Sequence, residues 1–166
     1  MTVEARDATG YVIRDLRWWD IEVVHRIEVD LFTIEPWSVG QFWNELAGVP
    51  ETRDFFVAER SATVGEPGIV VGYACLATVG GTSDVQTIAV ARDAQGRGVG
   101  RRLLSELLER AQRRGSHQVM LEVRAGNDVA VSLYRSVGFE EIHRRPNYYA
   151  PGVDAVVMEL RTADAT

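Results

Sequence analysis

The stretch Gln95–Leu104, QGRGVGRRLL, combines closely spaced glycines, clustered arginines and the beginning of an apolar helix pattern. A helix N-terminus presents unpaired N–H groups and a partial positive charge. Glycines let a backbone approach an anion closely, and the side chains of Arg97, Arg101 and Arg102 add positive charge. We therefore expect this segment to hold a phosphate or pyrophosphate group.

Two common nucleotide-binding patterns fit this loop poorly. The P-loop pattern ends in Gly-Lys-Ser or Gly-Lys-Thr, but all 18 basic residues of the chain are arginine. The dinucleotide pattern is Gly-x-Gly-x-x-Gly at the start of a parallel strand–helix–strand unit, whereas residues 96–100 read Gly-x-Gly-x-Gly after three antiparallel-type strands. Nucleotide binding, and a plain helix start with solvated arginines, are the alternatives for this loop.

Apolar periodicity places the loop between a strand and a long helix. It predicts strands near 11–16, 54–60, 69–79, 83–90, 118–123, 141–145 and 155–160, and helices near 20–32, 38–46, 99–111 and 129–137. Asp20, Ser38 and Asn127 are the expected N-caps, and Gly115 is the expected stop of the long helix. A strand–helix–strand crossover makes its two strands parallel. We therefore expect an α/β (α+β) fold, a mixed sheet with helices on its faces.

Length and composition favour one globular unit. The 166 residues suit a single domain over 1–166, with an ordered core at about 11–160, frayed ends and a turn at 65–68. The chain lacks a long apolar run, and MTVEARDATG is not a signal region, so we expect a cytoplasmic protein without a membrane partner. The net charge of −6 argues against direct binding of nucleic acid.

Metal and thiol chemistry are not expected. His25, His117 and His143 are widely scattered along the chain, which predicts no metal site. Cys75 is the single cysteine and lies in the apolar run GYACLA, so we expect a small buried residue and not a catalytic thiol.

Residues 87–111, TIAVARDAQGRGVGRRLLSELLERA, resemble motif A of the GNAT N-acetyltransferases, whose core is Gln/Arg-x-x-Gly-x-Gly/Ala. The resemblance extends over about 11–160 and implies a mostly antiparallel GNAT-like sheet with a central parallel strand pair. It also implies that the loop holds the pyrophosphate of acetyl-CoA, while the preceding strand pairs with the pantetheine arm. The residues implied in coenzyme binding are Ile88, Ala89, Val90, Gln95, Gly96, Arg97, Gly98, Val99, Gly100, Arg101 and Asn127.

Residues 121–139, LEVRAGNDVAVSLYRSVGF, resemble a narrower branch, the ribosomal-protein-alanine N-acetyltransferases. The segments EPWS and RRPNYYAPGVDAVVMEL match further parts of that branch. The branch acetylates the N-terminal alanine of a small-subunit ribosomal protein. The resemblance implies Glu122 as general base and Tyr134 as general acid. It also implies that the peptide entrance is lined by Trp37, Ser38, Tyr148 and Tyr149.

Other interpretations of these residues stay open at this stage. Glu122 is alternatively a surface carboxylate that pairs with Arg124 or Arg101, and Tyr134 a core aromatic residue. The four entrance residues are alternatively packing residues. The acceptor is alternatively a small-molecule amine, or the chain is a non-catalytic coenzyme-binding module. Asp30 and Glu35 lie near the EPWS loop and would favour a basic peptide.

Overall fold

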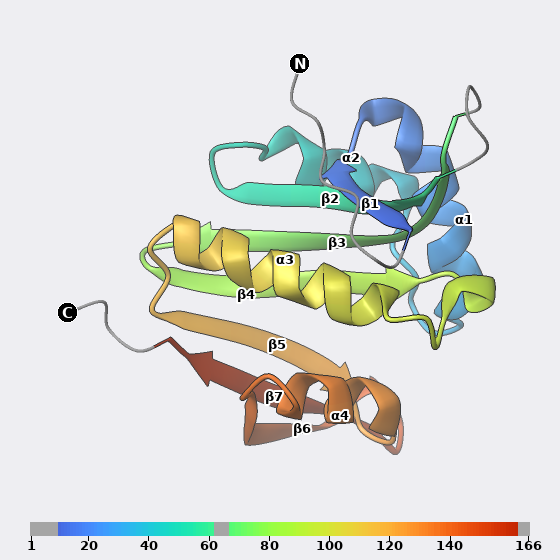
Figure 1. Ribbon diagram of the computed structural model, residues 1–166. Helices are drawn as coiled ribbons and strands as arrows, with labels where there is room; N and C mark the ends of the chain where they lie inside the picture. The colour runs from blue at the N-terminus through green and yellow to red at the C-terminus, as the bar shows by residue number, and fades with distance from the viewer. Residues whose placement is uncertain (1–9, 62–66, 163–166) are drawn as a thin grey trace.

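Seven strands form one mixed sheet in the computed structural model, which describes residues 10–61 and 67–162 (Figure 1). Across the sheet they are β1 (Tyr11–Asp15), β2 (Arg53–Arg60), β3 (Ile69–Val79), β4 (Thr82–Val90), β5 (Gln118–Arg124), β7 (Val153–Arg161) and β6 (Glu140–Ala150). The central β4–β5 pair is parallel, and the other neighbouring pairs of described strands are antiparallel. The expected mixed sheet with a central parallel pair is confirmed.

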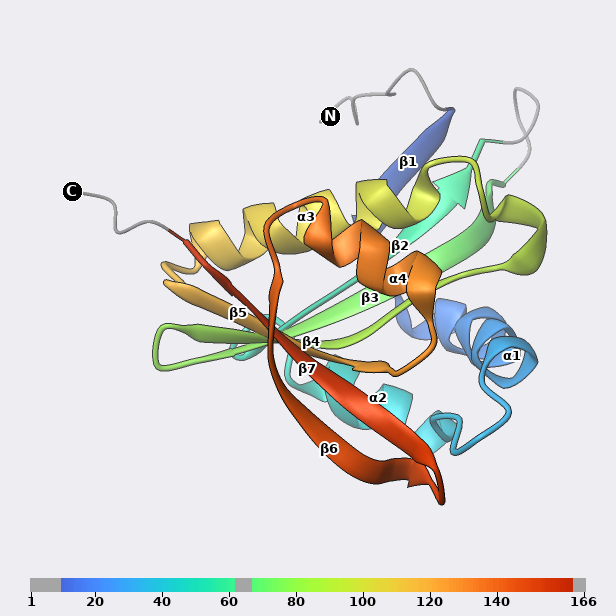
Figure 2. The same ribbon diagram turned by 90° about the horizontal axis from the view of Figure 1, so that it is seen from below.

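Helices cover both faces of this sheet (Figure 2). The helices α1 (Ile21–Leu31) and α2 (Val39–Ala47) lie on one face, and α3 (Val99–Arg113) and α4 (Asp128–Arg135) on the other. Short 3₁₀ turns, η1 (Trp18–Asp20) and η2 (Arg92–Ala94), precede α1 and follow β4.

Alternate residues of the inner strands enter two separate apolar cores, because successive side chains of a strand point to opposite faces. On β2, Phe56 and Ala58 join the core under α3, whereas Phe55 and Val57 join the core under α1 and α2. Both faces of these inner strands are therefore buried, and Cys75 is fully buried in the second core as expected. Burial raises the pKa of its thiol, which disfavours the reactive thiolate.

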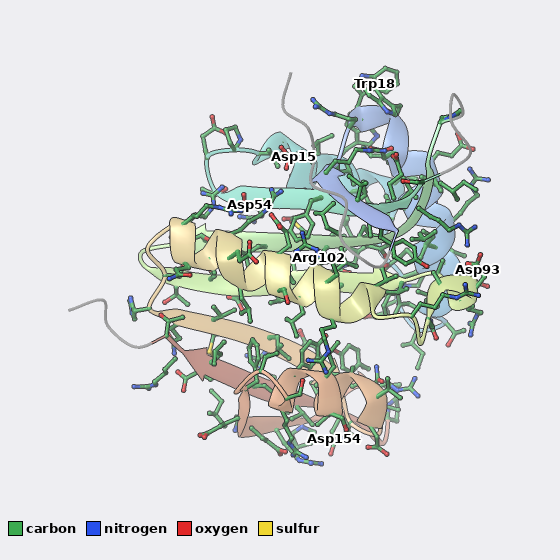
Figure 3. The ribbon with its side chains drawn as sticks, viewed as in Figure 1. Asp15, Trp18, Asp54, Asp93, Arg102 and Asp154 are labelled. Carbon is green, nitrogen blue, oxygen red and sulfur yellow. The ribbon has the colours of Figure 1, made fainter. Side chains whose placement is uncertain are left out.

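The predicted apolar stripe of α3 is confirmed, since its residues at four-residue intervals are all buried: Val99, Leu103, Leu107 and Ala111. Ion pairs attach the C-terminal end of α3 to the sheet. Arg110 Nη1 lies 2.8 Å from Asp15 Oδ1 and 3.6 Å from Asp54 Oδ1, and Arg114 also pairs with Asp54. Figure 3 labels the two aspartates, which come from β1 and β2. Gly115, with φ of +72°, ends the helix as predicted.

Three local expectations need correction. Asp20 precedes α1, but its carboxylate lies 2.7 Å from Arg14 Nη1 and accepts the N–H of Arg17, so it does not cap the helix. The side chain of Val129 is 85% exposed and does not enter the core. Strand β6 extends to Ala150, five residues beyond the expected end. Most of the expected frayed ends, and residues 65–66 of the expected turn, lie outside the described residues.

The strands β4 and β5 separate toward their carboxyl ends (Figure 1). Their parallel pairing runs from Thr82 opposite Gln118 to Val85 opposite Leu121, and stops there. At the same place the register of β4 against β3 shifts, so that Gln86 is an extra residue, a β-bulge. Beyond this bulge, among the described strands, β4 pairs with β3 alone, and its backbone edge toward β5 has no partner strand over residues 86–90.

Within the described ranges, no helix combines the length and apolar composition needed to span a bilayer. A search of the same residues finds no group of three or more His, Cys, Asp or Glu side chains arranged to hold a metal ion.

Candidate active site

A cleft of about 830 Å³ opens where β4 and β5 separate. Its walls are the α1–α2 loop, the second half of β4, the end of β5 with the start of α4, and the tyrosines of β6. Residues that the sequence singled out are brought together in this lining: Trp37, Ile88, Glu122, Asn127, Tyr134, Tyr148 and Tyr149. Segments more than 100 residues apart along the chain thus meet in one place.

The remaining predicted site residues lie outside this lining. Ala89 is buried in the core beneath α1, and Gln95 donates from Nε2 to the carbonyl oxygen of Val90 at 2.9 Å. The hydroxyl of Ser38 accepts the N–H of Gln41 at 3.3 Å and caps α2 as expected. The glycine loop begins directly after η2, at the carboxyl end of β4.

The glycine loop has the backbone geometry that an anion requires. Gly96 and Gly98 have φ of +71° and +83°, a region that favours glycine. The first hydrogen bond of α3 runs from the N–H of Arg102 to the carbonyl of Gly98, so the three preceding N–H groups have no acceptor within the helix. A Cβ at Gly100 would lie 3.6 Å from Leu133 and 3.8 Å from Val90, so the loop lies against α4 and the end of β4, two elements that also contribute residues to the cleft.

Glu122 lies on β5 just beyond the last pair with β4. Its Oε1 atom lies 3.0 Å from Nη1 of Arg145, and the hydroxyl of Tyr148 is hydrogen-bonded to the same carboxylate. That hydrogen bond raises the pKa of Tyr148, because it stabilises the protonated phenol. The alternative expectation, that this carboxylate pairs with Arg124 or Arg101, is wrong. Two residues of β6, Arg145 and Tyr148, hold the carboxylate instead.

Tyr134 forms part of the cleft wall on α4 and is 6% exposed. Its ring packs edge-on against Phe139, with the ring centroids 5.9 Å apart. Burial raises its pKa to about 12, and the nearby Tyr149 adds to the rise. Asn127 caps α4 as predicted by accepting the N–H of Ala130 at 3.3 Å. The site thus contains a phenol that stays protonated well above neutral pH.

An irregular turn of β6 presents the two tyrosines. Asn147 has φ of +52°, and its N–H donates to Oδ1 of Asp154 at 2.9 Å. Its own Oδ1 accepts the N–H of Gly152 at 2.6 Å, which closes the hairpin. The rings of Tyr148 and Tyr149 then stand perpendicular to each other, with centroids 5.1 Å apart.

Sequence reasoning missed one buried carboxylate of the cleft, that of Glu28 on α1, which is 4% exposed. It accepts the N–H of Trp37 at 2.9 Å and the hydroxyl of Tyr73. A signal was present in the sequence, because Glu28 stands at helical spacing between Val24 and Leu31, where the apolar stripe of α1 would otherwise continue.

The positions of three other acidic residues bear on the sequence expectations. Glu35 lines the cleft, but Asp30 does not, and its carboxylate lies 2.9 Å from Nε of Arg92. Asp84 on β4 was not singled out. Desolvation raises its pKa, and the nearby Glu122 adds to the rise while Arg145 opposes it.

Comparison with known proteins identifies related chains. Residues 14–139 match the acetyltransferase (GNAT) family. The Mycobacterium tuberculosis protein named N-alpha-acetyltransferase RimI is 41% identical over 87% of this chain and 89% of its own length. An uncharacterised Mycobacterium leprae protein is 42% identical over 92% of this chain, which spans only 41% of that longer relative. The crystal structure of the ribosomal-protein-S18-alanine N-acetyltransferase of Escherichia coli superposes with a TM-score of 0.78, at 31% identity over 94% of this chain and 96% of that one.

The glycine loop allows a paired test of backbone strain. We expect Gly98→Ala to lower the free energy of unfolding by about 1–2 kcal/mol, because φ of +83° is unfavourable for a residue with a Cβ. Gly100→Ala should leave it unchanged or raise it by up to about 1 kcal/mol, since its Cβ finds only ordinary contacts in a helical turn. Urea unfolding of both variants measures the difference, and equal effects would contradict this assignment.

Proposed function

The chain belongs to the acetyltransferase (GNAT) family, and we propose that it transfers the acetyl group of acetyl-CoA to the N-terminal α-amine of a protein. One observation carries the proposal. The cleft that opens where β4 and β5 separate is lined by both Glu122, at the end of β5, and Tyr134, on α4. The names of the M. tuberculosis and E. coli relatives support an α-amine as the acceptor.

The glycine loop and the open edge of β4 fit the co-substrate acetyl-CoA. The free N–H groups of Val99, Gly100 and Arg101, together with the loop arginines, would bind its pyrophosphate. Residues 88–90 would pair with the pantetheine arm as an added strand, since this edge of β4 has no strand partner. The hydrogen bond from Gln95 to β4 fixes the glycine loop relative to the open edge of this strand. Acetyl-CoA supplies the acetyl group as a thioester.

The side chains of the cleft provide the proton transfers that the reaction requires. An N-terminal amine has a pKa near 8, so it must lose a proton before it attacks. Glu122 accepts this proton, directly or through one water, while Arg145 and Tyr148 hold its carboxylate in place. Tyr134 donates a proton to the departing sulfur, and backbone N–H groups on the open edge of β4 stabilise charge on the carbonyl oxygen.

The acceptor we propose is the N-terminal alanine of a small-subunit ribosomal protein, as in the name of the E. coli relative. The side chains of Trp37, Tyr148 and Tyr149 would line its path to the cleft. Ser38 would act indirectly, because its hydroxyl fixes the start of α2 behind the loop. The carboxylate of Glu35 would favour a basic residue close to the N-terminus of the peptide.

The proposed reaction is tested with acetyl-CoA and short peptides that differ in their first two residues. We expect turnover of peptides that begin with Ala, and none of the same peptides with a blocked N-terminus, because the α-amine is the attacking group. Mass spectrometry locates the added acetyl group. Turnover of polyamines or other small amines with inert peptides would instead favour a small-molecule acceptor. Coenzyme binding without turnover of either class would favour a binding module.

The two proposed catalytic roles are tested by single substitutions. We expect Glu122→Gln and Tyr134→Phe each to lower kcat about 10²–10⁴-fold, the usual effect of losing a general base or acid. Coenzyme affinity, measured by calorimetry, should change little. Glu141→Gln serves as control, because this glutamate pairs with Arg144 on the exposed part of β6. Near-normal turnover of both cleft variants would refute the assignment.

The pH dependence tests Tyr134 separately. Burial raises its pKa to about 12, so its proton is present below that pH and lost only above it. We therefore expect kcat/KM to rise through about pH 8 as the amine deprotonates, and then to stay level to about pH 10. A decline between about pH 8 and pH 10 that disappears in Tyr134→Phe would contradict a high pKa for this phenol.

A further inference from the structure

A buried chain of hydrogen bonds connects β3 with the loop between α1 and α2. Glu28 Oε1 accepts the N–H of Trp37 at 2.9 Å, and Glu28 Oε2 accepts the hydroxyl of Tyr73. Tyr73 lies on β3, directly opposite Ala89 of β4. Glu28, Trp37 and Thr87 all line the cleft, whereas Tyr73 is fully buried beneath it.

The carboxylate of Glu28 is costly in this position. Glu28 is 4% exposed, and both groups that donate to it, a phenol and a backbone amide, are neutral. Burial of a charge without a cationic partner is unfavourable, and an apolar residue of similar size often gives a more stable protein. Val24 and Leu31 continue the apolar stripe on either side, so a leucine would suit the packing better. Stability therefore does not explain why a carboxylate occupies this position.

The loop that Glu28 holds requires an anchor. Glu35 has φ of +50°, a left-handed conformation that is unfavourable for a residue with a Cβ. Two residues later, the N–H of Trp37 bonds to Glu28, and the Trp37 ring packs edge-on against Phe42 with centroids 5.4 Å apart. The same loop segment forms one wall of the cleft. Tyr148 and Tyr149 also line this cleft.

We infer that Glu28 is a positioning residue for the acceptor: through Tyr73 on β3, the neighbour of β4, it fixes the α1–α2 loop at a set distance from β4. This inference rests on the proposed function, in which β4 carries the acetyl donor and the loop guides the peptide. Glu28 touches neither reacting group in this role. It sets where the incoming amine stands relative to the thioester, and small displacements there cost large factors in rate.

Two substitutions separate hydrogen bonding from packing. Glu28→Gln keeps both bonds, because its amide oxygen can accept the Trp37 N–H and its amide nitrogen can donate to the hydroxyl oxygen of Tyr73. Glu28→Leu fills the same space and removes both bonds. Glu22→Leu on the exposed face of α1 is the matched control.

We expect Glu28→Leu to raise the KM for an Ala-initiated peptide about 10-fold or more, while the Kd for acetyl-CoA stays within about 2-fold. Its thermal midpoint should be unchanged or higher, which loss of a merely structural contact would not give. Glu28→Gln and Glu22→Leu should keep the peptide KM close to that of the unaltered chain. Tyr73→Phe removes one of the two bonds and should raise the peptide KM by a smaller factor.

A second measurement does not depend on activity. Amide hydrogen exchange at Trp37 should become faster in Glu28→Leu and stay slow in Glu28→Gln, because only the leucine removes the acceptor. Unchanged exchange in Glu28→Leu, or an equal rise in peptide KM and acetyl-CoA Kd, would overturn the inference. If no peptide is acetylated by the unaltered chain, the proposed function fails, and the exchange rates alone decide whether Glu28 holds the loop.

Discussion

The separation of β4 from β5 after Val85 and Leu121 is the constraint on which the site depends. A continuous parallel pair would fill this part of the sheet and satisfy its own backbone groups. The bulge at Gln86 interrupts the register against β3 at the same point, so β4 keeps one partner and leaves its other edge open. Three features follow from that divergence. They are the cleft itself, the position of the Glu122 carboxylate where the unpaired part of β5 begins, and the approach of the chain to α4.

The sheet tolerates this opening because the surrounding structure is firmly held. Apolar cores lie against both faces, and ion pairs of Arg110 and Arg114 join the far end of α3 to β1 and β2. In the proposed function, the coenzyme side of the site therefore begins on a firmly held helix, where the glycine loop presents three N–H groups that have no acceptor within α3. The acceptor side is different, because a few directional hydrogen bonds hold the α1–α2 loop and the turn of β6.

Local patterns predicted most of the fold. The stripe of α3, the caps at Ser38 and Asn127 and the stop at Gly115 depend on neighbouring residues, so their physical causes are visible in the sequence. Asp20 was misassigned for the opposite reason, since Arg14 competes for its carboxylate. The partners of Glu122 were also missed, because the antiparallel hairpin that brings Arg145 beside it is set by the irregular register of β6. Long-range partners of this kind carry no signal in residue spacing.

The two buried or half-buried carboxylates of the cleft show how one chemical group acquires different roles. Glu122 meets a guanidinium and a phenol, and its side chain is 28% exposed, an arrangement that suits exchange of a proton. Glu28 lines the cleft but is only 4% exposed, and both of its oxygens are already engaged by an amide and a phenol. The same functional group is thus suited to proton transfer at one wall and to holding a loop at the other. In the proposed function, this division follows from depth and partners, with Glu122 on β5 taking part in the chemistry and Glu28 on α1 placing the acceptor.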